Sequence, residues 1–232
     1  MNINNLNNIK NKNKILICGC KGQLGKALSE KKNKKYKIYL TNKTNLDITK
    51  YKILKKKITL IKPDFIINAA AYTDVDLAEK QTIKAKKINM IGPKNLAKIA
   101  KELDACLIHV STDYVFDGLK NKNYLESDHT NPLSIYGKTK LQGENEIKKL
   151  IRKYVIIRVS WLYGPKNNNF VTNILKVGKR RNVIRMVNDQ FGMPTYSHDL
   201  SNAIWSIIEK IRKNDSLYGI YHYSSYGKAM SR

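Results

Sequence analysis

Two side chains that could exchange a proton stand one helical turn apart in this sequence. Tyr136 and Lys140 belong to the stretch Ser134-Ile-Tyr-Gly-Lys-Thr-Lys140, and this spacing places both on one face of a helix. A free tyrosine has a pKa of about 10 and is a poor acid at neutral pH, but a neighbouring cation lowers that pKa. The pair therefore predicts a proton donor with its electrostatic partner. An exposed surface pair is the alternative, because this spacing is frequent by chance.

Hydroxyl groups that could hold a carbonyl follow an apolar run in Val110-Ser-Thr-Asp113. We expect Thr112 to hydrogen-bond a substrate carbonyl and to hold it against Tyr136, with Asp113 also at the substrate. Such a group of residues suits reduction of a ketone, because the new alkoxide needs an acid.

A glycine-rich turn, Gly19-Cys-Lys-Gly-Gln-Leu-Gly25, separates an apolar run from an expected helix. We expect Gly19 to permit the tight turn, Gly22 to let the backbone approach a pyrophosphate, and Gly25 to let the helix pack closely. The free N–H groups of the helix start would face the phosphates. The turn predicts a dinucleotide cofactor, although its spacing differs from the usual fingerprint and a merely tight turn is the alternative.

The end of the second expected strand bears on which dinucleotide binds. An acid there would bind the ribose 2′-hydroxyl of NAD, but Leu40-Thr-Asn-Lys43 has no acid before Asp47. A cation and a hydroxyl tolerate a 2′-phosphate, so we predict that NADPH serves at least as well as NADH. Lys43 as one more solvated lysine is an equal alternative.

Alternating patterns of strand and helix must position these residues. Short apolar runs predict strands at 15–18, 36–40, 65–68, 105–110, 154–159, 183–187 and 219–223. Helical spacing predicts helices at 23–30, 48–61, 75–103 in two pieces with Pro93 in the first turn of the second, 132–150, 169–178 and 198–212. This order predicts an α/β fold, a Rossmann-like doubly wound parallel sheet that binds ligands beyond the C-terminal strand ends.

The predicted domains follow from the same patterns. We expect a disordered leader at 1–13, an NAD(P)-binding Rossmann domain at 14–160, and a mixed segment at 161–232 that contributes to the sheet edge and to a substrate lobe. Residues 229–232 have the pattern of a helix cut short. The small C-terminal lobe is therefore expected to be incomplete, with apolar surface exposed.

Composition limits the classes of protein that the chain can belong to. The net charge of +26 over 232 residues comes from lysines spread along the whole chain. This predicts a solvated basic surface that attracts anionic nucleotides, and no specific nucleic-acid partner. A nucleic-acid site is the less favoured alternative that the charge permits. The three cysteines have neither zinc-ligand nor disulfide spacing. With no apolar stretch of about 18 residues and no signal peptide, we expect a cytoplasmic protein without a membrane partner.

The chain resembles the extended short-chain dehydrogenase/reductases and, within them, the dTDP-4-dehydrorhamnose reductases, in a C-terminally shortened form. The stretches that carry this resemblance are Gly19-Cys-Lys-Gly-Gln-Leu-Gly25, Asn68-Ala-Ala-Ala-Tyr-Thr-Asp-Val-Asp76, Val110-Ser-Thr-Asp-Tyr-Val-Phe-Asp-Gly118, Tyr136-Gly-Lys-Thr-Lys140, Arg158-Val-Ser-Trp-Leu-Tyr-Gly164 and Asp189-Gln-Phe-Gly-Met-Pro-Thr195. They occur in order across nearly the whole chain after residue 13.

The resemblance implies a role for each matching residue. Tyr136 would donate the proton, Lys140 would anchor the cofactor and support Tyr136, and Thr112 would contact the carbonyl. The residues expected along the cofactor are Gly22, Gln23 and Leu24 at the pyrophosphate, Asp47 and Ile48 at the adenine, and Ala71, Tyr72, Thr73 and Val110. The residues expected near the sugar nucleotide are Trp161, Gln190, Gly192, Pro194 and Thr195. A core aromatic is the alternative for Trp161, and a structural turn for the last four.

The implied reaction is NAD(P)H-dependent reduction of the C4 ketone of dTDP-4-dehydro-L-rhamnose to dTDP-L-rhamnose, a precursor of cell-surface polysaccharide. Related sugar-nucleotide dehydratases place a glutamate where this chain has Tyr114, which favours simple reduction over elimination of water. The alternative is a non-catalytic NADP-binding module, similar to the regulatory subunit of methionine adenosyltransferase. Family members can form homodimers, sometimes through Mg²⁺, for which this sequence offers no identifiable ligands.

Overall fold

A computed structural model describes residues 13–31, 35–166 and 169–231. All but the last residue of the predicted leader at 1–13 lies outside the described residues. Over the part that is described, no helix is long and apolar enough to cross a membrane.

Six parallel strands form the central sheet, as predicted. The strands are β1 (Lys14–Cys18), β2 (Lys37–Thr41), β3 (Phe65–Asn68), β4 (Cys106–Thr112), β5 (Tyr154–Val159) and β9 (Gly219–Tyr223), in the order β2-β1-β3-β4-β5-β9. Pairing aligns Cys18 with Asn68 and Asn68 with His109. The C-terminal ends of β1, β3 and β4 therefore meet at one edge of the sheet, which carries the motifs identified in the sequence.

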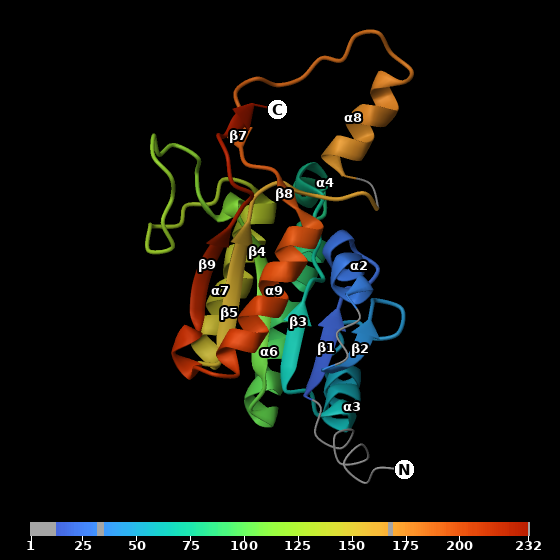
Figure 1. Cartoon of the computed structure of the whole chain (residues 1–232), viewed down its shortest axis with the longest axis vertical. Helices are drawn as coiled ribbons and strands as arrows, with labels where there is room; N and C mark the ends of the chain where they lie inside the picture. Colours follow the sequence, from blue (N-terminus) through green and yellow to red (C-terminus); the bar gives the residue numbers. More distant parts are fainter. Residues whose placement is uncertain (1–12, 32–34, 167–168, 232) are drawn as a thin grey trace.

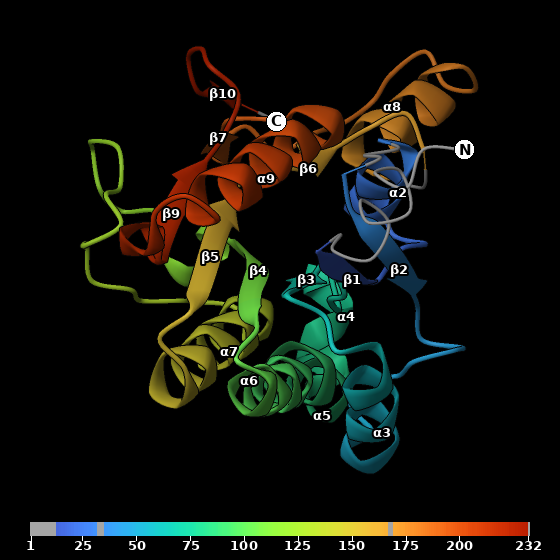
Figure 2. The same ribbon diagram turned by 60° about the horizontal axis from the view of Figure 1, so that its bottom comes forward.

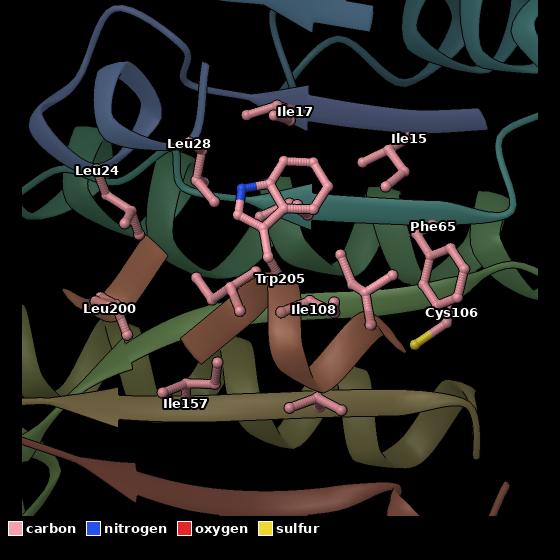
Figure 3. Close-up of a cluster of buried hydrophobic side chains, with 14 of the residues drawn as sticks. Ile15, Ile17, Leu24, Leu28, Phe65, Cys106, Ile108, Ile157, Leu200 and Trp205 are labelled. Atoms are coloured by element: carbon pink, nitrogen blue, oxygen red, sulfur yellow. The ribbon is translucent and has the colours of Figure 1, made fainter. Parts of the chain in front are cut away.

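Helices cover both faces of the sheet (Figure 1, Figure 2). One face carries α2 (Gln23–Glu30) and α9 (Ser197–Ile211), and the other carries α3 (Tyr51–Ile61), α6 (Gly92–Leu103) and α7 (Ile135–Leu150). Trp205 of α9 fills the first core between Leu28, Ile17 and Ile108 (Figure 3). Leu54, Ile58, Leu96 and Ile147 fill the second. Because both faces are buried, the inner strands are continuous apolar runs.

The predicted helical stretch at 75–103 divides into four helical segments. It comprises α4 (Val75–Lys80), α5 (Thr82–Lys86), a π-helical turn η1 (Lys87–Ile91) and α6. Pro93 lies in the first turn of α6, as expected. Helix propensity does not reveal the π-helical turn within this stretch, which contains the buried Asn89.

The start of α7 is set by Ser134. Its hydroxyl accepts a hydrogen bond from the Gly137 N–H at 3.1 Å, which satisfies one of the free donors of the first turn. The helix predicted at 132–150 therefore begins at Ile135. The loop before it contains one short 3₁₀ turn, η2 (Asp113–Val115).

The C-terminal segment differs most from the prediction. Its elements are β6 (Leu162–Tyr163), α8 (Phe170–Gly178), β7 (Phe191–Gly192), β8 (Thr195–Tyr196), η3 (Asp215–Leu217) and β10 (Met230–Ser231). The predicted strand at 183–187 is wrong: this stretch has no regular structure, and Val183, Met186 and Val187 are exposed rather than paired in a sheet. The predicted helix start at 229–232 is also wrong, since Met230 and Ser231 pair antiparallel with β7.

Helix α8 stands away from the sheet (Figure 1). None of its residues is buried, and Phe170, Val171, Leu175 and Val177 are exposed. The asparagine cap at Asn169 and the reciprocal hydrogen bond of Thr172 stabilise the first turn of α8.

Candidate active site

A cleft of about 380 Å³ lies where β1, β2 and β3 end. Six of the residues predicted for the cofactor line it: Gly19, Gly22, Lys43, Asp47, Ile48 and Ala71. Nine others also line it: Lys21, Asn42, Leu46, Thr49, Ala69, Ala70, Lys84, Lys87 and Ile88. A larger hollow, of about 490 Å³, lies at the opposite edge, next to Lys101, Lys149 and Lys153. In folds of this class ligands bind at the C-terminal strand ends, so the first cleft is the candidate site.

The glycine turn brings the start of α2 close to the end of β1. Gly19 has φ of +83°, and a Cβ there would lie 2.7 Å from the Ala70 nitrogen. A Cβ on Gly25 would lie 2.1 Å from the Gly19 carbonyl oxygen. Any side chain at either position would therefore collide with backbone. The start of α2 faces the cleft with its first N–H groups free of intrahelical partners, and such a site suits a phosphate.

The lining of the cleft is basic, with Lys21 in the glycine turn and three further lysines outside it. Lys43 lies after β2, while Lys84 and Lys87 lie one helical turn apart after β3. Asp47 is the acidic residue among those lining the cleft, and its carboxylate accepts hydrogen bonds from the Thr49 N–H and hydroxyl at 2.9 and 2.8 Å. Lys84 and Lys87 were not among the predicted cofactor residues, although their i, i+3 spacing is a signal that the sequence offers.

Tyr136 lies beside Thr112 at the end of β4. Burial raises the pKa of the Tyr136 phenol, a hydrogen bond with the Thr112 side chain lowers it in part, and the nearby Asp113 raises it. Although part of the Tyr136 residue remains accessible to solvent, its titrating end is enclosed. The Tyr114 ring meets the Tyr136 ring edge-on at 5.6 Å. The predicted neighbours Thr112 and Tyr136 are thus brought together.

Lys140 contacts strand β4 rather than the Tyr136 phenol. Its buried Nζ donates to the Val110 carbonyl oxygen at 2.6 Å and lies 3.4 Å from His109 Nε2. Burial lowers the pKa of Lys140 to about 8, an effect that Glu144 opposes. Burial is thus the largest influence on the pKa of the Tyr136 phenol, and Lys140 is bound by strand β4. That Lys140 lowers the pKa of Tyr136 stays a prediction.

The loop after β3 is held by hydrogen bonds from the Asn89 side chain, a residue that no sequence motif indicates. Asn89, in the π-helical turn, accepts from the Tyr72 N–H at 2.8 Å and donates to the Tyr72 carbonyl oxygen at 3.0 Å. It also donates to the Thr139 hydroxyl at 3.2 Å. Asn89 thus joins the predicted cofactor loop to the helix that carries Tyr136. Tyr72 is buried, whereas Thr73 is exposed.

The segment after β5 lies next to the start of α2. The Gln23 side chain donates to the Leu162 carbonyl oxygen and accepts from the Asn169 amide, both at 2.8 Å. Gln23 therefore links the glycine turn to the C-terminal segment rather than pointing freely into the cleft. Leu24 lies in the core, and Val110 contributes its carbonyl oxygen to Lys140.

The residues predicted near the sugar nucleotide fall on this C-terminal segment. Trp161 is half-buried and has φ of +41°, an uncommon conformation for a bulky residue. Its indole lies against Gly192, and its carbonyl oxygen accepts from the Thr195 N–H at 3.2 Å. Thr195 is fully buried, and Gln190 is exposed. The structure brings Trp161 and Thr195 together, and leaves Gln190 without a described contact to them.

Comparison with known proteins decides the family. The family described as RmlD substrate binding domain matches residues 13–232. This chain belongs to the RmlD family.

The relatives of this RmlD-family chain include proteins named as dTDP-4-dehydrorhamnose reductases and a polysaccharide biosynthesis protein. A dTDP-4-dehydrorhamnose reductase of Aggregatibacter actinomycetemcomitans is 42% identical over 214 residues, which are 91% of this chain and 73% of the relative. The spore coat polysaccharide biosynthesis protein SpsK of Bacillus subtilis is 37% identical over 215 residues, 92% of this chain and 74% of that protein. The crystal structure of dTDP-4-dehydrorhamnose reductase from Bacillus anthracis in complex with NADP has a TM-score of 0.90 and 43% identity. It covers 95% of this chain, which spans 77% of that one.

No cluster of three or more His, Cys, Asp or Glu side chains suited to a metal ion occurs among the described residues of this RmlD-family chain. None of the three cysteines, all within the described residues, forms a disulfide, and Cys18 and Cys106 are buried. Burial raises the pKa of Cys18 to about 12, so this thiol stays protonated and unreactive at neutral pH.

Proposed function

We propose that the chain is an NADPH-dependent dTDP-4-dehydrorhamnose reductase that converts the C4 ketone of dTDP-4-dehydro-L-rhamnose to the hydroxyl of dTDP-L-rhamnose. The observation that carries the proposal is the placement of Thr112 against Tyr136 at the same sheet edge as the glycine turn. Family membership and the reductase names of the relatives support the substrate.

The residues of the cleft suit a dinucleotide with an additional phosphate. Gly19 and Gly25 let the turn and the start of α2 pack against neighbouring backbone, where a Cβ would collide. The start of α2 would offer N–H donors to the pyrophosphate. Lys43, Lys84 and Lys87 would attract the 2′-phosphate. Bound NADPH would supply the hydride for the sugar C4. The NADP in the crystal structure of the Bacillus anthracis relative supports this choice.

Thr112 and Tyr136 would act on the ketone oxygen. Thr112 would donate to the oxygen and so hold the carbonyl beside the phenol. Tyr136 would give its proton to the oxygen as negative charge develops there. A high phenol pKa in the cofactor-free state keeps this proton in place until the alkoxide, which is a much stronger base, takes it. Trp161 and Thr195 would flank the nucleotide part of the substrate.

We predict that Tyr136→Phe lowers kcat by about 10²-fold or more, because general acid catalysis contributes about 10²- to 10⁴-fold. The assay is NADPH oxidation with dTDP-4-dehydro-L-rhamnose, together with NADPH binding by fluorescence. Tyr124→Phe is the matched control, since Tyr124 lies in the loop near Asp117, to which its hydroxyl donates at 2.6 Å, and it takes no part in the proposed reaction. Equal kcat values for wild type and Tyr136→Phe would refute the assigned acid.

A further inference from the structure

A buried histidine lies directly behind the lysine of the site. His109 on β4 is fully buried, and its ring bridges Asn68 on β3 and Lys140 on α7. Asn68 Nδ2 lies 3.0 Å from His109 Nδ1, and Lys140 Nζ lies 3.4 Å from His109 Nε2. The proposed reaction gives this ring no role.

The Ala70 N–H determines which groups donate and which accept in the contacts among Asn68, His109 and Lys140. The Ala70 N–H can only donate, and it donates to Asn68 Oδ1 at 3.2 Å. The other end of the amide, the Asn68 Nδ2, must therefore donate to His109 Nδ1. A neutral imidazole with an accepting Nδ1 carries its proton on Nε2, so the Nε2–H points at Lys140 Nζ.

An N–H aimed at Lys140 favours an amine over an ammonium there, because an ammonium has no lone pair to accept it. A neutral amine can accept from His109 and still donate to the Val110 carbonyl oxygen at 2.6 Å. The alternative tautomer would set the His109 Nδ1–H against the Asn68 Nδ2–H. Turning the Asn68 amide to relieve that contact would leave the Ala70 N–H without its acceptor.

The other charged and titratable groups near Lys140 do not reverse this preference. Glu144 lies one turn further along α7 and favours the ammonium. Its carboxylate is, however, bound by Arg158 Nη2 of β5 at 2.8 Å and by the Ser111 hydroxyl of β4 at 2.5 Å. Burial raises the pKa of Tyr136, one turn earlier on α7, and so holds its phenol protonated.

We propose that His109 is a positioning residue of the reductase: Asn68 fixes its Nε2–H tautomer, and this N–H donates to Lys140 and favours the neutral amine. Burial of Lys140 acts in the same direction, with a pKa of about 8. The catalytic consequence rests on the proposed function. If reduction needs the ammonium, activity falls as the pH rises through the ionisation of Lys140, and His109 sets where that alkaline fall occurs.

The first test reads the tautomer without any turnover. The cofactor-free chain is labelled with ¹⁵N-histidine, and the ring signals of His109, one of four histidines, are assigned by their loss in His109→Gln. We expect an Nε2–H tautomer whose Nε2 signal follows an ionisation near pH 8, the pKa of Lys140, and loses that ionisation in Lys140→Met. An Nδ1–H tautomer in the wild type, or an unchanged ionisation in Lys140→Met, would overturn the proposal.

The second test reverses the tautomer with a nearly isosteric change. Asn68→Asp keeps the acceptor for the Ala70 N–H but places a carboxylate opposite His109 Nδ1, which draws the proton to Nδ1 and leaves Nε2 free to accept from an ammonium. The alkaline fall of kcat/KM for NADPH-dependent reduction should then move up by about 1 pH unit or more. A merely structural role would lower activity equally at every pH. Because the new carboxylate also favours the Lys140 ammonium directly, the shift supports the inference only where the ¹⁵N signals of Asn68→Asp show His109 protonated on Nδ1. An unmoved profile, or a moved profile with the proton still on Nε2, contradicts the inference.

The two tests separate this inference from the proposed function. If the histidine spectra are as expected but the dTDP-linked ketone is not reduced, the inference about the His109 tautomer stands and the proposed substrate is refuted. Reduction of that ketone by a chain whose His109 carries its proton on Nδ1 would retain the function and reject the inference.

Discussion

At the scale of single residues, Tyr136 and Lys140 lie one helical turn apart on α7 but bond with different partners. Tyr136 bonds with Thr112, while Lys140 bonds with Val110 and contacts His109. The types and spacing of Tyr136, Lys140 and Thr112 in the sequence were enough to predict that they belong to one candidate site. The contact of Lys140 with His109 could not be predicted, because it depends on how α7 packs against β4 and leaves no local pattern in the sequence.

The buried lysine makes stability depend on pH. Its pKa falls from the ordinary value of 10.5 to about 8 on folding, so the unfolded chain holds this proton more tightly between these two values. Stability therefore rises with pH across that window, by up to about 3 kcal/mol from this group. We predict that Lys140→Met removes this rise, measured as the free energy of unfolding in urea at several pH values between 7 and 10.5.

The control for this experiment is Lys56→Met, because Lys56 is exposed on α3. Its curve should keep the slope of the wild type, which contains the contributions of all other lysines and tyrosines. A Lys140→Met curve parallel to the wild type over this range would show that Lys140 does not lose its proton more readily in the folded state.

At the scale of elements, the glycine turn depends on close approach of backbone to backbone. We predict that Gly25→Ala destabilises the fold by about 1–3 kcal/mol, the usual effect of overpacking, and weakens NADPH binding. The reason is that the new Cβ would lie 2.1 Å from the Gly19 carbonyl oxygen, which cannot move without displacing the turn. Thermal unfolding and NADPH titration measure the two effects.

Gly178→Ala provides the matched control within another helix. Its Cβ would make an ordinary contact of 3.6 Å with Ile184, and alanine favours helix over glycine by about 1 kcal/mol. This variant should be neutral or slightly stabilising and should leave NADPH binding unchanged. Equal effects of the two substitutions would argue against the tight approach at Gly25.

The order of strands and helices in the main sheet was predictable because each strand is a short apolar run followed by a turn. Expectations failed where an apolar run had no partner to pair with. Val183 and Val187 are typical of a strand, but both are exposed in an irregular stretch. Conversely, the two-residue strands at β7 and β10 pair residues far apart in the chain, which no local signal indicates.

At the scale of the whole molecule, the net charge of +26 creates a field that attracts any anionic ligand. We therefore expect selectivity between the two cofactors to come from lysines at the cleft. We predict that Lys43→Glu lowers the preference for NADPH over NADH about tenfold, since a charge-assisted hydrogen bond contributes about 1.5 kcal/mol. Dissociation constants for both cofactors at fixed salt concentration measure the preference.

Lys56→Glu makes the same change in net charge on α3, at a residue that does not line the cleft. It should weaken NADPH and NADH binding alike and leave their ratio unchanged. If Lys43→Glu also left that ratio unchanged, another cation of the cleft, such as Lys84 or Lys87, would have to bind the 2′-phosphate.

The central claim is that Tyr136 and Thr112 serve hydride transfer to a sugar ketone, and isotope transfer tests it most directly. The chain is incubated with dTDP-4-dehydro-L-rhamnose and NADPH that carries deuterium on the transferring face of its nicotinamide C4, and the sugar nucleotide is analysed by mass spectrometry and proton NMR. We predict dTDP-L-rhamnose with one deuterium at the sugar C4, formed by the wild type and nearly absent with Tyr136→Phe. Unchanged ketone, or product without deuterium at C4, would contradict this claim.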